Sequence, residues 1–419
     1  MRLLLEDCTL LSGGGNILIE DGKIVYVGKD TPPSDRRVPV RGNWVIPGII
    51  DPHEHLRDLE QADKEDWTSG SQAAFSGGIT TVFEMPNTIP PTTNIHNLNL
   101  KRTAAGRSLL NHKFFLGVTH DNLSELEFIL RQDADDIVGI KIFLADSGSL
   151  SAIRDKKIIR QLFSLARKYN TVVAVHTELQ DCLENWQRKT SGNKIAFHNE
   201  IRNRRCAIQG TELVLKIARE IKNKLYLAHV STREEVELVR SYKDDNTIYC
   251  EVTPHHLLLN ETVLDRVGNF GKVNPPLRTA ADNAALWQAV RDGTIDLIGT
   301  DHAPHTRAEK QKPYPAAPSG FPGSETLLPL LLTAVNKEYL TMNRLTELTA
   351  GRAAEIFDLP DRGVIKAGSR ADLVVVDKNK KWTIDAAKFH SKAKYSPFDG
   401  MEVEGAVLMT LIDGSIVLP

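Results

Sequence analysis

The chain of 419 residues lacks the features that mark membrane, nucleic-acid-binding and secreted proteins. Its longest apolar run, residues 327–335, is about half the length of a membrane span and includes Pro329 and Thr333. The formal net charge is -2, so the sequence has no excess of positive charge that would attract nucleic acid or an acidic membrane. We expect no signal peptide, because the first five residues lead directly into Glu6 and Asp7.

Cysteine is also scarce. The four cysteines, Cys8, Cys182, Cys206 and Cys250, are far apart and form no Cys-x-x-Cys pair. Such spacing is typical of reduced thiols in a cytoplasmic protein. We therefore expect four free thiols and a cytoplasmic location.

The remaining composition, with 41% apolar and 25% charged residues, is that of a globular protein. The length exceeds one average domain and suits one large barrel with a smaller unit.

Both chain ends are rich in sequence signals for β-strands. Apolar runs at 17–19 and 24–27 flank an Asp-Gly turn, and runs at 371–376 and 406–412 precede another.

These patterns predict three segments. Residues 1–44 and 351–419 should pair into a small composite β-sandwich domain, and residues 45–350 should form the barrel. Within the barrel, apolar runs alternate with helical patterns such as 157–168, 210–221, 233–241 and 281–291. The eight predicted strands are 45–50, 80–83, 114–118, 139–143, 171–175, 224–228, 247–252 and 296–299.

Eight strands with helical crossovers indicate an α/β fold, a closed (β/α)8 TIM-like barrel. An open doubly wound sheet is the alternative, but no Gly-x-Gly-x-x-Gly follows the first strand. In such barrels, chemistry gathers at the carboxyl ends of the strands. The polar residues at those positions are therefore the candidates for a site.

The most informative motif is Asp51-Pro52-His53-Glu54-His55, directly after the first predicted strand. Along an extended chain, residues two apart lie on one side, so His53, His55 and Arg57 should face one pocket. Two histidines one residue apart can hold one metal ion from a single segment. Taken alone, a His-x-His pair is more often two polar loop histidines than a metal site.

Other strand ends carry similar residues. Lys141 lies in the fourth strand, His176 and His229 end the fifth and sixth, and Asp301 follows the eighth. If the strands close into a barrel, these side chains converge around its axis. Four imidazoles and a carboxylate exceed the needs of one tetrahedral ion and suit a pair of divalent ions.

Two neighbouring cations need a bridging anion. Desolvation can remove the proton of an interior lysine, and the neutral amine can add carbon dioxide to become a carbamate. Lys141 lies in the apolar run Gly139-Ile140-Lys141-Ile142-Phe143, which disfavours a surface salt bridge. Asp146, five residues further on, is the rival bridge.

At this point the sequence resembles the amidohydrolase superfamily and, within it, the dihydroorotases. The motifs that carry the resemblance are His53-Glu54-His55-Leu56-Arg57, Met85-Pro86-Asn87-Thr88, Gly139-Ile140-Lys141-Ile142, Val175-His176-Thr177-Glu178, Ala228-His229-Val230-Ser231, Asn274-Pro275-Pro276-Leu277-Arg278 and Thr300-Asp301-His302-Ala303-Pro304-His305. The sequence departs from the family in one place, because Asp58-Leu59-Glu60 stands where many dihydroorotases have Glu-Pro-Gly. One bacterial branch of the family bridges its metals with an aspartate instead of a lysine, which keeps Asp146 as the alternative to Lys141.

The resemblance implies a site with two Zn²⁺ ions per chain. His53, His55 and Asp301 would hold the first ion, His176 and His229 the second, and N6-carboxylated Lys141 would bridge them. Asp301 would also be the catalytic acid and base. The substrate-binding residues would be Arg57, Asn87, Asn274, His305, Ser319 and Gly320.

The implied reaction is the reversible interconversion of dihydroorotate and N-carbamoyl-aspartate in pyrimidine synthesis, through a metal-bridging hydroxide. Arg57 favours this small-molecule substrate because a guanidinium can bind a ring carboxylate, although a salt bridge with Asp58 or Glu60 is the simpler role. The alternatives are an allantoinase, a hydantoinase, and an inactive scaffold that binds a pathway enzyme. By resemblance we also expect a homodimer and association with other enzymes of the pathway.

Overall fold

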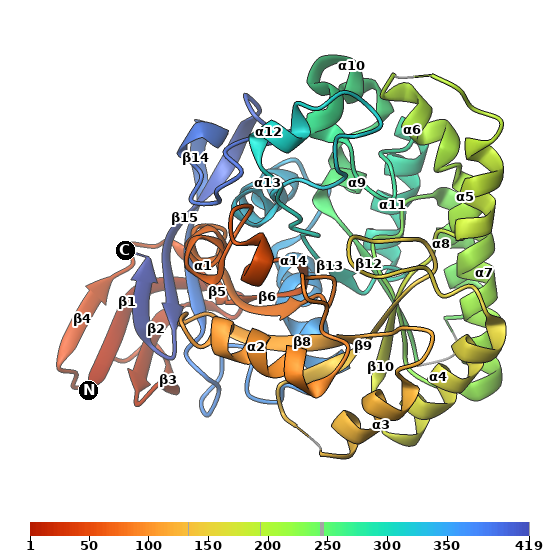
Figure 1. Cartoon of the computed structure of the whole chain (residues 1–419). Coiled ribbons are helices and arrows are strands. Elements are labelled where there is room, and N and C mark those ends of the chain that lie inside the picture. Colours follow the sequence, from red (N-terminus) through yellow and green to blue (C-terminus); the bar gives the residue numbers. More distant parts are fainter. Residues whose placement is uncertain (133, 193, 244–246, 419) are drawn as a thin grey trace.

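The computed structural model describes residues 1–132, 134–192, 194–243 and 247–418. It contains an eight-stranded parallel barrel surrounded by helices and a separate mixed sheet (Figure 1). The expected α/β barrel is therefore confirmed. Among the described helices, none combines the length and the apolar character that a membrane crossing needs.

The barrel strands pair in parallel and in chain order. Its two edges meet where Glu54 bridges to His302, and the His55 N–H donates to the His302 carbonyl over 2.8 Å. The sheet is thus nearly closed. Its strands are β6 (Ile49–Glu54), β7 (Ile79–Glu84), β8 (Asn111–Gly117), β9 (Ile137–Phe143), β10 (Val172–His176), β11 (Leu225–Leu227), β12 (Ile248–Val252) and β13 (Leu297–Ile298).

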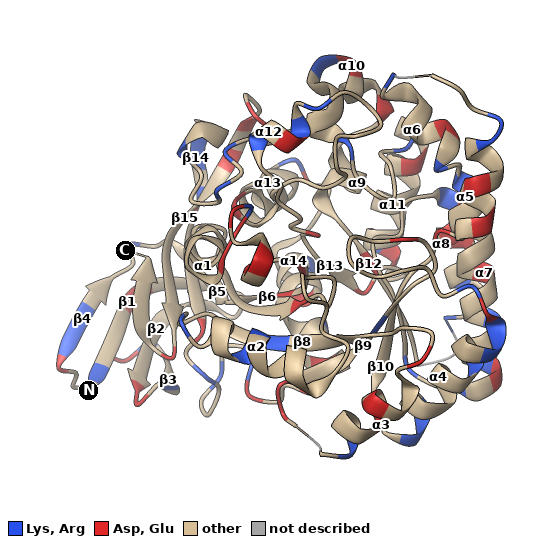
Figure 2. Cartoon of the chain, viewed as in Figure 1, with Lys and Arg blue, Asp and Glu red and all other residues tan. Residues whose placement is uncertain are grey.

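The helices follow local sequence signals. For example, α11 begins at a capping box between Thr279 and Asp282 and ends before Gly293, whose φ is 84°. The four predicted helical segments are α4, α7, α8 and α11. Acidic and basic residues both occur along α3 and α7 (Figure 2). The helices are α1 (Trp67–Ser76), α2 (Ile95–Ala105), α3 (Leu123–Arg131), α4 (Lys156–Lys168), α5 (Gln180–Gln187), α6 (Ala196–Ile201), α7 (Arg204–Ile221), α8 (Arg233–Arg240), α9 (Pro254–Leu258), α10 (Leu264–Val267), α11 (Ala280–Asp292), α12 (Arg307–Lys310), α13 (Ser324–Asn336), α14 (Met342–Thr346) and α15 (Arg352–Ile356).

Apolar side chains fill the amino-terminal end of the barrel. Phe357, directly after α15, packs its ring 4.8 Å from that of Phe83 and 5.7 Å from that of Tyr226, measured between centroids. Phe83 and Tyr226 come from opposite parts of the barrel wall and belong to the same interior cluster. In the part of the chain that the structure describes, this end of the barrel interior is therefore filled by side chains, which directs the search for a site to the carboxyl end.

We expect Phe357→Ala to lower the free energy of unfolding by about 3–5 kcal/mol, because it leaves a cavity among rigid aromatic rings. Denaturant-induced unfolding followed by circular dichroism measures the effect. Phe128→Ala is the matched control, because the Phe128 side chain on α3 is 53% exposed. An equal loss in both variants would contradict this account of the barrel floor.

The second sheet joins both chain ends, as expected from the two β-rich segments. Its order is β16-β15-β14-β5-β1-β2-β3, with β4 paired to β1. An apolar cluster lines it, with Leu3, Ile17, Val375 and Leu411 among its members. The strands are β1 (Arg2–Leu10), β2 (Gly13–Glu20), β3 (Lys23–Gly28), β4 (Arg36–Pro39), β5 (Trp44–Pro47), β14 (Leu373–Thr383), β15 (Glu402–Ile412) and β16 (Ser415–Leu418).

The single strand expected over residues 45–50 is wrong. The structure divides it into β5, which pairs with β14 in the mixed sheet, and β6, which starts the barrel. The chain changes sheet at Gly48, whose N–H donates to the Asp372 carbonyl over 2.8 Å. A Cβ at Gly48 would lie 2.2 Å from Thr80 Oγ1, so only glycine fits at this crossing.

Candidate metal centre

Strand alternation directs Lys141 into the barrel. Its neighbours Ile140 and Ile142 pack in the outer core, whereas its register partner on β10, Ala174, belongs to the interior cluster. The Lys141 side chain is fully buried, and its Nζ has no hydrogen-bond partner in the described part of the chain. A buried, unpartnered amine needs an explanation other than packing.

Beside Lys141 lies a cluster of two imidazoles and one carboxylate. Asp301 Oδ1 is 3.2 Å from His55 Nε2 and 3.5 Å from His53 Nε2. One ligand atom from each of these three buried residues lies within 4.8 Å of the others. The donor set and its compactness fit a divalent metal ion.

A second pair of imidazoles adjoins this cluster. His176 Nδ1 lies 3.0 Å from His229 Nε2, and the His229 ring centroid is 5.2 Å from that of His53. Two nitrogens on one tetrahedral ion, each at about 2.0–2.1 Å from it, would be about 3.3 Å apart. The structure thus brings together all six residues assigned to the two metal ions.

Three of the histidines have a partner on their other ring nitrogen. His53 Nδ1 lies 3.1 Å from Glu251 Oε2, and His55 Nδ1 lies 2.7 Å from Asn87 Oδ1. His176 Nε2 lies 3.1 Å from Glu178 Oε2. Such partners fix the ring orientation and leave the opposite nitrogen free to bind a metal.

Sequence reasoning gave Glu251 and Glu178 no role. Glu251 lies inside an apolar strand, and its carboxylate also accepts a hydrogen bond from the Tyr226 hydroxyl. The signal that could have found it is a charged residue at an inward-facing position of a buried run. For Glu178, the signal is its place two residues after His176.

The electrostatics of the site favour the metal-binding form of each side chain. Burial lowers the pKa of all four imidazoles, which therefore stay neutral at pH 7. Burial also lowers the pKa of Lys141 to about 8, which makes the neutral amine accessible. Burial alone would raise the pKa of Glu178, but Arg202 and His176 outweigh it and bring it down to about 2.

Several site residues have left-handed backbone conformations. The φ angle is 59° at Arg57, 39° at His229 and 47° at Asp301. Such angles are uncommon outside glycine and persist where the surrounding structure holds them. They aim these side chains into the opening of the barrel.

A cavity of about 400 Å³ lies above the cluster. It is lined by the four histidines and Asp301, and also by Lys64 and Phe143. Asp146 lines it too, with an exposed side chain whose carboxylate accepts the Ala152 N–H over 2.9 Å. All six of the expected substrate-binding residues line this cavity: Arg57, Asn87, Asn274, His305, Ser319 and Gly320.

Arg57 is positioned by uncharged groups. Its Nε donates to the Pro304 carbonyl over 3.1 Å, and one terminal nitrogen lies 3.3 Å from His305 Nε2. Asp58 pairs instead with Arg107 over 3.1 Å. Within the described residues Arg57 has no ion pair, so the expected alternative of a bridge to Asp58 or Glu60 is absent.

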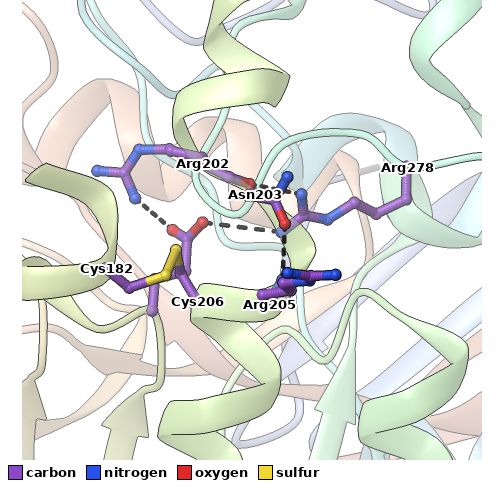
Figure 3. Close-up of a disulfide and its surroundings, with 7 residues drawn as sticks. Cys182, Arg202, Asn203, Arg205, Cys206 and Arg278 are labelled. Carbon is purple, nitrogen blue, oxygen red and sulfur yellow. Dashed lines mark hydrogen bonds and ion pairs between the residues drawn. A yellow bond between two sulfur atoms is a disulfide. The ribbon is translucent and has the colours of Figure 1, made fainter. Parts of the chain in front are cut away.

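The expectation of four free thiols is wrong. Cys182 on α5 and Cys206 on α7 form a disulfide with their Cα atoms 5.4 Å apart (Figure 3). The sequence separation of 24 residues gives no hint of this pair. The packing of α5 against α7 brings the two residues together, whereas Cys8 and Cys250 are free and buried.

Fold and site together define a barrel hydrolase with a metal-binding cluster at the strand ends. The chain belongs to the amidohydrolase family, whose model matches residues 44–417. It is 34% identical to a dihydroorotase of Methanosphaera stadtmanae, over 99% of this chain and 96% of that protein. It is 37% identical to a dihydroorotase of Halobacterium salinarum (89% and 86%) and 32% identical to an L-hydantoinase of Paenarthrobacter aurescens (99% and 94%).

Solved structures agree with this placement. The L-hydantoinase from Arthrobacter aurescens matches with a TM-score of 0.94 and 30% identity, over 99% of this chain and 96% of that one. The dihydropyrimidinase from Brevibacillus agri matches with a TM-score of 0.92 and 25% identity, over 100% and 95%. The chain is thus similar to enzymes named for cyclic amides.

Proposed function

We propose that this chain is a dihydroorotase, a hydrolase of cyclic amides that interconverts dihydroorotate and N-carbamoyl-aspartate. The observation that carries the proposal is the buried Arg57 guanidinium in the cavity, without an ion pair among the described residues and facing the histidine cluster. Dihydroorotate offers a ring carboxylate as its partner. The dihydroorotases among the relatives, at 34–37% identity, support the same substrate.

We propose two Zn²⁺ ions as the resident metals. His53, His55 and Asp301 would hold one, His176 and His229 the other, with N6-carboxylated Lys141 between them. The fully buried, unpartnered Nζ supports Lys141 over the exposed Asp146 as the bridge. Bound zinc supplies a Lewis acid for the carbonyl and lowers the pKa of a bound water to near 7.

The chain's own residues then have distinct tasks. Arg57 binds the carboxylate and orients the ring. The Asn274 Oδ1 is buried without a hydrogen-bond partner, so it can accept a ring N–H. Asp301 takes a proton from the attacking water and delivers it to the leaving ring nitrogen, which completes ring opening. Ring closure follows the same path in reverse.

We expect Arg57→Met to lower kcat/KM for dihydroorotate by about 10²-fold, mainly through KM, because a lost charged hydrogen bond is worth about 1.5–3 kcal/mol. A hydantoin without a carboxylate serves as control substrate, and its turnover should not fall in the variant. Steady-state assays with both substrates measure the difference. Unchanged turnover of dihydroorotate would refute the role of Arg57.

A hydantoinase is the second candidate, because the L-hydantoinase structure superposes on 99% of this chain. Assays of dihydroorotate, hydantoin and allantoin side by side distinguish the candidates. A higher kcat/KM for hydantoin or allantoin would replace the proposed substrate. An inactive scaffold would show neither bound zinc nor turnover. The cytoplasmic location, the homodimer and an association with other enzymes of pyrimidine synthesis stay predictions.

A further inference from the structure

Glu178 is the partner of one of the two imidazoles assigned to the second metal. It is fully buried, and its Oε2 lies 3.1 Å from His176 Nε2. The other nitrogen of that ring, Nδ1, faces His229 Nε2 at 3.0 Å. A carboxylate at Nε2 keeps the proton on that nitrogen, so the lone pair of Nδ1 points toward the metal position.

Two arginines, both labelled in Figure 3, hold the Glu178 carboxylate. Arg202 pairs with Oε2, and Arg278 lies 3.7 Å from Oε1. Arg278 also donates to the Arg202 carbonyl over 2.7 Å, so the two guanidinium groups are connected. A buried carboxylate needs such charged partners, because removing one of them leaves an uncompensated buried charge.

The disulfide fastens the segment that carries Arg202. Arg202 precedes α7, and Cys206 lies in the first turn of that helix. The Cys206 carbonyl accepts the N–H of Leu179, the residue after Glu178, over 3.2 Å. The bond to Cys182 fixes the same turn to α5, which begins directly after Leu179. The start of α7 is therefore tied to the Glu178 segment by a covalent bond, a hydrogen bond and an ion pair.

We propose that Glu178 is a positioning residue for the second metal site, held there by Arg202, Arg278 and the start of α7 that the Cys182–Cys206 disulfide anchors. The inference rests on the proposed two-metal centre and is independent of the substrate. The proposal also gives a function to Arg278, the last residue of the Asn274-Pro275-Pro276-Leu277-Arg278 motif. Arg278 lies next to the Glu178 carboxylate and does not line the cavity.

The test is a Zn²⁺ titration of the full-length, metal-free protein, with bound zinc counted by mass spectrometry. For Glu178→Ala we expect the Kd of one of the two zinc ions, assigned to the His176 site, to rise by about 10–100-fold, with little change in the Kd of the other. Glu178→Gln should give a smaller rise, because its amide oxygen can still accept from His176. Arg202→Met should act in the same direction. Arg205→Met is the matched control, since Arg205 is an exposed cation on the same turn with no ion pair in the described part of the chain.

The disulfide is tested on the wild-type protein. The disulfide is reduced with a phosphine, the reductant is removed before the zinc titration, and thiol counting verifies the reduction. The reduced protein should bind the second zinc more weakly and keep its circular dichroism spectrum, and Cys182→Ser should do the same. A reduced protein with unchanged zinc affinity would overturn the part assigned to the disulfide.

Two results would overturn the role of Glu178. One is a folded Glu178→Ala variant that binds both ions as the wild type does. The other is an equal loss of both ions, which indicates a general structural role. A wild-type protein that binds a single ion would instead refute the two-metal centre, and this inference with it.

Discussion

Asp301→Asn is expected to reduce kcat for dihydroorotate by about 10⁴-fold, the upper end of what a positioned acid–base group contributes. Asparagine keeps the shape of the side chain but cannot take up or return the proton. The carboxylate also lies 3.2 Å from His55 Nε2 and 3.5 Å from His53 Nε2, so the variant loses a charged neighbour of both rings. Single-turnover kinetics measure the chemical step directly.

The control for Asp301 is the zinc content of the variant. If asparagine retains both ions while turnover is lost, the missing group is the proton carrier. A variant that loses zinc as well shows that Asp301 is needed as a ligand. A turnover within tenfold of the wild type would contradict the assignment of Asp301 as acid and base.

Lys141→Ala is expected to remove the second zinc and to lower turnover by at least about 10³-fold, because Lewis-acid stabilisation is worth several kcal/mol and 1.36 kcal/mol corresponds to tenfold. The variant lacks the fully buried amine that is proposed to become the bridging carbamate. Zinc analysis and steady-state assays measure the two effects. Wild-type protein loaded in ¹³C-bicarbonate should also show a carbamate NMR signal that the variant lacks.

Asp146→Ala is the matched control for Lys141. Asp146 lies at the cavity rim, exposed and bonded to the Ala152 N–H, so its loss should leave both ions in place. If Asp146→Ala loses the second zinc and Lys141→Ala keeps it, the aspartate is the bridge.

The barrel could be predicted because its strands lie on short apolar runs, and several of these runs end at or next to a polar residue, such as His176 after Val175 in β10 and His229 after β11. His53, His176 and His229 could be placed at one end of the barrel from this rule alone. The split between β5 and β6 could not be predicted, because both halves of residues 45–50 are apolar. An apolar run predicts a strand but does not show which sheet that strand joins. The crossing at Gly48 becomes visible only when the strand pairings are known.

The supporting carboxylates and the disulfide escaped prediction for a different reason. Glu251 acts on a histidine of a distant segment, and Glu178 acts on a ring only two residues away. A local signal exists for each of them, but it does not name the ring nitrogen that the carboxylate will face. Cys182 and Cys206 meet because α5 and α7 pack together, a contact that depends on the completed barrel. Long-range packing of this kind has no signature in composition or spacing.

The pairing of β5 with β14 has a consequence for biosynthesis. Residue 47 leaves the ribosome about 326 residues before Leu373, the first residue of its partner strand. At about 5–20 residues per second, that gap is roughly 16–65 s of translation. During this time the edge of β5 is open to wrong partners, so a nascent chain stalled before residue 373 should recruit chaperones that a released, full-length chain does not need.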